Sequence, residues 1–135
     1  MITWSGRILA FLGALHLAVG TLLSSRYIGE WLSFQLWFDG TDVTELRPAV
    51  GAFWLGPGSF GLPLLLIGLL VEWMDRRDIV PPAFLALALL AWIGVGAVIL
   101  EPAPWLVAGV AAVLLLVGTR RSAAAPGAVS VPRAG

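Results

Sequence analysis

One histidine, His16, is the residue of this sequence best suited to chemistry. It lies nine residues beyond Arg7 in an apolar run, about 14 Å along a helix, and it is the only ionisable side chain in the interior of any long apolar segment. Ionisable groups inside apolar membrane spans are costly and commonly functional. A neutral imidazole donates one hydrogen bond and accepts another, and it titrates near neutral pH, so ligand binding and proton relay are its two candidate chemistries.

A second candidate feature is the proline- and glycine-rich stretch 54–63. Pro57 and Pro63 lack an N–H and should free the carbonyls of Phe53 and Ser59. Counting residues inward from the segment ends places Ser59 and Trp92 in the same layer as His16. We therefore predict a ligand-binding group made of His16, Ser59, Trp54 and Trp92. A purely structural hydrogen bond from His16 between two helices is the alternative that the sequence leaves open.

Small residues surround the histidine at helical spacing. Gly6, Gly13 and Gly20 form a stripe on the first apolar segment, and Gly58 and Gly61 lie in the second. Small residues let helix backbones approach closely, so these five glycines are predicted helix-packing residues. His16 should then point toward other helices and away from lipid.

Three carboxylates, Asp39, Asp42 and Glu45, are spaced three apart and form a weak candidate for a hard-cation site. A turn at Asp39-Gly40 and a helix N-cap at Asp42 explain the same residues and are favoured. The sequence contains no cysteine, which excludes disulfides, thiolate catalysis and zinc–cysteine sites. We expect no metal and no cofactor.

The elements that must position these residues are long apolar segments. The chain has 135 residues, of which 59% are hydrophobic and 12% charged, against about 25% charged in soluble domains. Four segments, 7–23, 48–73, 81–100 and 102–118, approach the roughly 20 residues that cross a bilayer. Prolines at 48, 81 and 102 suit helix starts. We predict an all-α integral membrane four-helix bundle whose partner is the lipid bilayer.

Two further segments complete the predicted organisation, a transmembrane domain over 1–119 and a tail. The loop 24–47 carries many apolar and aromatic residues between 28 and 38, which favours a short interfacial amphipathic helix, although the alternation over 32–38 also fits a strand. Residues 120–135 are rich in Ala, Pro and Gly and read as a disordered cytoplasmic tail.

The arginines set the predicted orientation. Four spans place both termini and the connection between the second and third spans on one side, and that side carries six arginines: Arg7, Arg76, Arg77, Arg120, Arg121 and Arg133. The other side carries Arg26 and Arg47. The positive-inside rule then puts both termini in the cytoplasm, in the cell (inner) membrane. A cleaved signal peptide within Met1–Gly20 is the competing interpretation, and its removal would leave three spans.

Several short motifs resemble a domain-of-unknown-function family of small four-span bacterial membrane proteins. They include Gly13-Ala14-Leu15-His16, continuing to Gly20, then Phe53-Trp54, Gly61-Leu62-Pro63 and the Glu101–Leu106 connection. The resemblance covers about residues 4–118. It implies the four-span topology and supplies no activity, cofactor or site.

These observations predict a binding or interaction module for a small apolar molecule or a membrane partner. The formal net charge is zero, so no nucleic-acid partner is expected. One alternative is a membrane enzyme with His16 as acid or base on a lipid-soluble substrate. A second is a subunit of a small oligomeric transporter, and homo-oligomerisation is compatible with each function.

Overall fold

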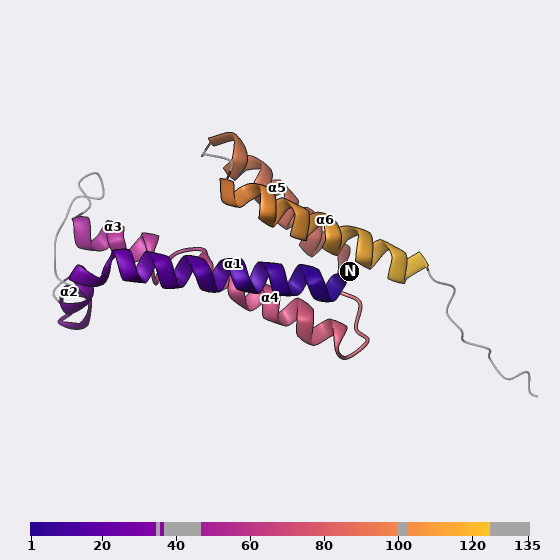
Figure 1. The fold of residues 1–135 in the computed structure, drawn as a ribbon, viewed down its shortest axis with the longest axis horizontal. Helices are drawn as coiled ribbons and strands as arrows, with labels where there is room; N and C mark the ends of the chain where they lie inside the picture. Colours follow the sequence, from indigo (N-terminus) through magenta and orange to yellow (C-terminus); the bar gives the residue numbers. More distant parts are fainter. Residues whose placement is uncertain (35, 37–46, 100–102, 125–135) are drawn as a thin grey trace, which may run out of the picture.

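The computed structural model describes residues 1–34, 36, 47–99 and 103–124, and every regular element within them is helical (Figure 1). The predicted all-α class is therefore confirmed over these residues. In chain order the elements are α1 (Ile2–Leu23), the 3₁₀-helix η1 (Ser25–Tyr27), α2 (Ile28–Leu32), α3 (Pro48–Leu55), α4 (Gly61–Asp75), α5 (Ala83–Ile99) and α6 (Ala103–Ala124).

The helices pack pairwise in the order α4, α1, α6 and α5. α1 packs against α4 on one side and against α6 on the other, and α6 packs against α5. Figure 1 shows the α5–α6 hairpin crossing α1 obliquely, close to the start of α1 and diverging beyond it. Near the start of α1 the two helices are in contact, because the buried Ser5 Oγ donates a hydrogen bond to the Ala111 carbonyl of α6 at 2.7 Å. The second half of α1 is thus left uncovered on that side.

Glycines bring α1 and α4 into backbone contact. Gly6 and Gly13 on α1 lie against Gly68 and Gly61 on α4. A Cβ built on Gly13 would lie 2.6 Å from the Gly61 carbonyl oxygen, and one built on Gly6 would lie 2.8 Å from the Gly68 carbonyl oxygen. Real Cβ atoms do not approach that closely, so these positions exclude any larger residue at this helix separation.

The predicted span 48–73 is interrupted between α3 and α4. We expected a kinked helix with a free Phe53 carbonyl, and that expectation is wrong. The Phe53 oxygen accepts hydrogen bonds from the Gly58 N–H at 2.8 Å and the Gly56 N–H at 3.2 Å. Pro57 has no N–H to continue the helix, and the Gly58 bond closes the turn in the manner of a helix C-cap.

The loop after α1 starts as the predicted helix. α2 packs on α3 because the Trp31 Nε1–H donates to the Ala49 carbonyl at 2.8 Å and its ring meets Phe53 edge-on. Residues 35 and 37–38 lie outside the described residues, so the strand alternative is answered only for the segment up to Leu32, which is helical. At the other end of the chain, α6 continues through Ala124, so residues 120–124 of the predicted tail are helical.

Charged side chains gather where the start of α1 lies beside the end of α4. Glu72 accepts hydrogen bonds from Arg76, one helical turn away, at 2.7 Å and from Arg7 at 3.3 Å. Thr3 adds a hydrogen bond to the Asp75 carboxylate. Within the described part of the chain, Ile2–Leu23 and Trp105–Ala124 are long and apolar enough to cross a membrane, while Ala83–Ile99 is a shorter apolar helix.

Candidate functional site: a groove beside His16

His16 combines a buried polar atom with an aromatic partner. Its Nε2 is shielded from solvent and has no hydrogen-bond partner among the described residues. Its ring lies on Phe60, with centroids 4.2 Å apart and planes tilted by 35°. The glycine at 61 makes this position available, because a Cβ there would lie 3.0 Å from the His16 Cδ2. The turn between α3 and α4 therefore holds the imidazole in place.

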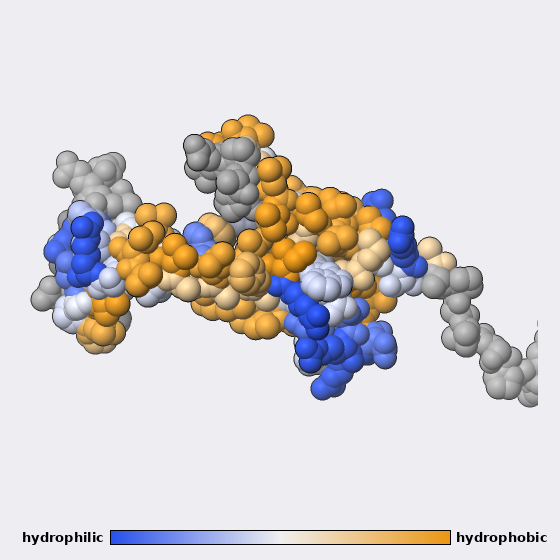
Figure 2. Space-filling model, in the orientation of Figure 1, coloured by the Kyte–Doolittle hydropathy of each residue, from blue (hydrophilic) through white to orange (hydrophobic). Residues whose placement is uncertain are grey.

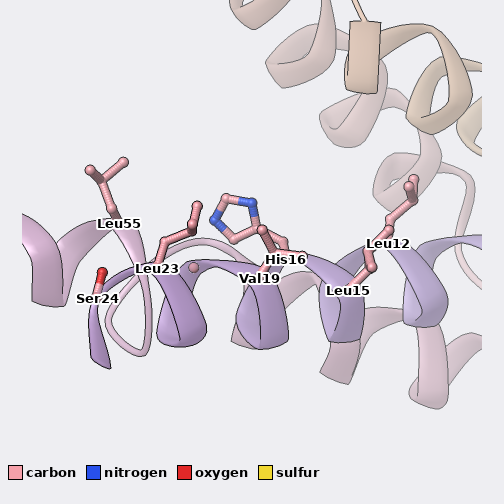
Figure 3. A pocket seen from close by; sticks show the side chains of 8 residues that line it. Leu12, Leu15, His16, Val19, Leu23, Ser24 and Leu55 are labelled. Carbon is pink, nitrogen blue, oxygen red and sulfur yellow. The ribbon is translucent and has the colours of Figure 1, made fainter. Parts of the chain in front are cut away.

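A groove of about 420 Å³ opens beside this imidazole. One face of α1 between Leu12 and Ser24 forms its floor, and Leu55 at the end of α3 closes one side. In Figure 3 the imidazole projects from α1 on the same side as the Leu12 and Leu23 side chains. The lining is aliphatic apart from His16 and Ser24, and the Ser24 Oγ is already bonded to the Ala52 carbonyl at 3.3 Å. His16 is thus the lining side chain left to offer a polar atom to an occupant, and its Nε2 has no partner among the described residues.

Ser59, which we predicted in the same layer as His16, makes a local hydrogen bond instead. Its hydroxyl oxygen accepts the Gly61 N–H at 3.2 Å, at the start of α4. Ser59 is buried and does not line the groove. Its role in the structure is to cap the turn that carries Phe60.

The two predicted tryptophans have different surroundings. Trp92 meets Phe60 edge-on at 5.3 Å and Trp105 at 5.1 Å, so it reaches His16 only through the Phe60 ring. The Phe60 and Trp92 rings border a second cavity of about 260 Å³ between α4 and α5. Trp54 is 62% exposed and packs on Phe53. It does not line the His16 groove.

Phe60 and Leu55 are the residues that sequence reasoning missed. Both lie within the proline- and glycine-rich stretch 54–63, next to residues that were selected. A kinked but continuous helix was expected there, whereas α3 ends at Leu55 and Phe60 lies in the turn before α4. The available signal was Gly56-Pro57-Gly58, which is typical of a turn that interrupts a helix and not of a mild kink.

The remaining predicted residues are the helix-packing glycines and the three candidate metal-binding carboxylates. Gly20 approaches the backbone of Leu55 and Gly56, and Gly58 lies against the Phe53 ring. Asp39, Asp42 and Glu45 lie outside the described residues. Within the described part of the chain, no three metal-ligating side chains gather at one place.

Over the described residues the chain is a small all-α protein with many exposed large apolar side chains and two helices apolar enough to cross a membrane. The model of a family of unknown function, DUF6463, matches residues 1–122, and the chain belongs to that family. The predicted membership of a family without assigned activity is therefore confirmed. No curated protein and no solved structure matches the chain.

Proposed function

We propose that this protein crosses the membrane four times, through α1, the α3–α4 pair, α5 and α6, with both termini in the cytoplasm of the cell that makes it. Large aliphatic and aromatic side chains are exposed along all of these helices, including Leu22 at 72% and Val98 at 87%. Figure 2 shows this apolar surface between hydrophilic groups at the two ends. Water would penalise such a surface, and lipid would not.

Within that framework, the protein binds a small lipid-soluble molecule in the groove beside His16. The observation that carries this proposal is the buried, unpartnered Nε2 atom at the edge of an aliphatic groove. A buried polar atom without a partner is destabilising by about 1–3 kcal/mol. A ligand hydroxyl or carbonyl at hydrogen-bonding distance would remove that penalty.

Binding is favoured over acid–base catalysis by the surroundings of the imidazole. A catalytic histidine is commonly oriented by a carboxylate that contacts its second nitrogen. Among the described residues, the side chains beside His16 are aliphatic or aromatic. The ring is held by stacking and close packing, which suits a fixed hydrogen-bonding group.

Ligand-dependent stabilisation of the detergent-solubilised full-length chain tests this function. We expect at least one of hexadecan-1-ol, cholesterol and a prenylated quinone to raise the melting temperature, because a ligand that binds only the folded state stabilises it. His16→Ala should fold and lose that response. Trp54→Ala, which changes a side chain outside the groove, should keep it. A response to none of the three probes, or an unchanged response in His16→Ala, would contradict the proposal.

A further inference from the structure

The shape of the groove restricts its occupant. Its floor follows α1 from Leu12 to Ser24, a distance of about 18 Å along the helix axis. The other lining residue, Leu55, lies at the end of α3, so the groove is a long, open channel along the helix axis. A long, open channel with aliphatic walls suits an extended hydrocarbon chain lying along α1.

The chemistry of the lining restricts the polar part of the occupant. Among the described residues that line the groove, none has a side chain with a fixed charge. A charged headgroup placed at His16 would lose its hydration without an opposite charge to replace it, whereas a hydroxyl or carbonyl needs only one hydrogen bond. The polar group that meets Nε2 is thus uncharged.

The position of the imidazole orients the chain. His16 lies toward the Leu12 end of the floor, and about 12 Å of groove continues past Val19 and Leu23 to Ser24. On the other face of the imidazole, Phe60 fills the space at a ring separation of 4.2 Å. An occupant bonded to Nε2 therefore has room for its chain in one direction, along α1 toward Leu55.

We infer that the ligand is a neutral, single-chain lipid with one hydroxyl or carbonyl group, bound with that group at His16 Nε2 and its chain along α1. This inference rests on the proposed binding function and narrows it to one class. Phospholipids and fatty acids carry charges that the groove does not neutralise, and the rigid fused rings of a sterol match a long channel less well than one flexible chain does.

Two substitutions separate the polar contact from the shape of the groove. His16→Phe keeps a ring on Phe60 and removes Nε2, so the affinity for hexadecan-1-ol should fall about tenfold, the effect of one lost hydrogen bond. Val19→Phe narrows the groove and should weaken hexadecan-1-ol and hexadecane alike. Val113→Phe is the matched control, because Val113 on α6 is 48% exposed against 46% for Val19 and borders none of the described cavities.

The decisive measurement is a binding titration of the full-length wild type and these variants with hexadecan-1-ol, hexadecane, palmitate and cholesterol. The inference expects hexadecan-1-ol to bind most tightly, with losses in His16→Phe and Val19→Phe and none in Val113→Phe. Tighter binding of cholesterol or palmitate, still dependent on His16, would overturn the single-chain neutral class and leave the binding function standing. If none of the probes binds, both proposals fail.

Discussion

Ser5 is a polar side chain that the apolar interior satisfies completely, in contrast to His16. It is fully buried, and its hydroxyl donates to the Ala111 carbonyl on α6 at 2.7 Å. Ala111 lies within α6, so the serine adds a hydrogen bond between α1 and α6 without disrupting the backbone hydrogen bonds of either helix. The polar atom without a partner, His16 Nε2, thus belongs to a residue of the groove, whereas the Ser5 hydroxyl, which has a partner, lies in the core.

At the residue scale, Ser5→Ala should lower the free energy of unfolding by about 1 kcal/mol, the usual contribution of one interhelical hydrogen bond in an apolar environment. Unfolding of the detergent-solubilised protein in sodium dodecyl sulfate, followed by tryptophan fluorescence, measures the change. Ser122→Ala, at an exposed position of α6, should leave the stability unchanged. Equal stability of Ser5→Ala and the wild type would mean that this bond does not hold α6 to α1.

At the scale of elements, the α1–α4 pair depends on glycines spaced seven residues apart. Gly6 and Gly13 on α1 face Gly68 and Gly61 on α4, which run in the opposite direction. A spacing of seven keeps the small residues on one side of each helix over two turns. The contact is therefore made along a seam and not at a single crossing point.

Gly13→Ala should reduce stability by about 1–3 kcal/mol, because the new methyl group would force the helices apart. Gly94→Ala is the control on α5, where a Cβ would meet no atom within 4 Å. There the same substitution should be neutral or add up to about 1 kcal/mol through helix propensity. Thermal or denaturant unfolding of both variants makes the comparison. Similar effects at the two positions would refute the glycine seam.

The sequence predicted the positions of the helices better than the turn that separates α3 from α4. Apolar length located α1, α5 and α6, and the small stripe indicated the face of α1 that meets α4. Residues 48–73 read as one span because hydropathy does not distinguish a kink from a turn when Gly56, Pro57 and Gly58 are all tolerated in apolar segments. The same limit applies to the site, since the position of Phe60 depends on that turn.

Tertiary arrangement was the least predictable feature. Matching depths placed Ser59 and Trp92 in the layer of His16, but depth gives no direction around a helix axis. In the structure, Ser59 turns to the Gly61 N–H and Trp92 is separated from His16 by Phe60. A four-helix bundle was predicted, and in the described structure α1 packs on α4 and α6, while α4 and α5 border a shared cavity.

For the whole molecule, the proposed topology places the loop after α1 outside the cell and the end of α6 inside. The chain contains no cysteine, so Ser33→Cys and Ser122→Cys each introduce one exposed thiol. In intact cells, a membrane-impermeant maleimide should label Ser33→Cys and spare Ser122→Cys, and lysis should expose both. Labelling of Ser122→Cys alone would reverse the orientation. Labelling of both in intact cells would contradict the proposed four crossings.

The divergence of α6 from α1 has a consequence for how an occupant arrives. The groove beside His16 opens along the flank of α1, where Leu15 and Val19 are each 46% exposed. In the proposed orientation that flank faces the acyl chains, so the route of entry is lateral diffusion within the leaflet. Occupancy is then set by the mole fraction of the ligand in the bilayer. Even a weakly held lipid fills the groove if it is abundant there, and its solubility in water is irrelevant.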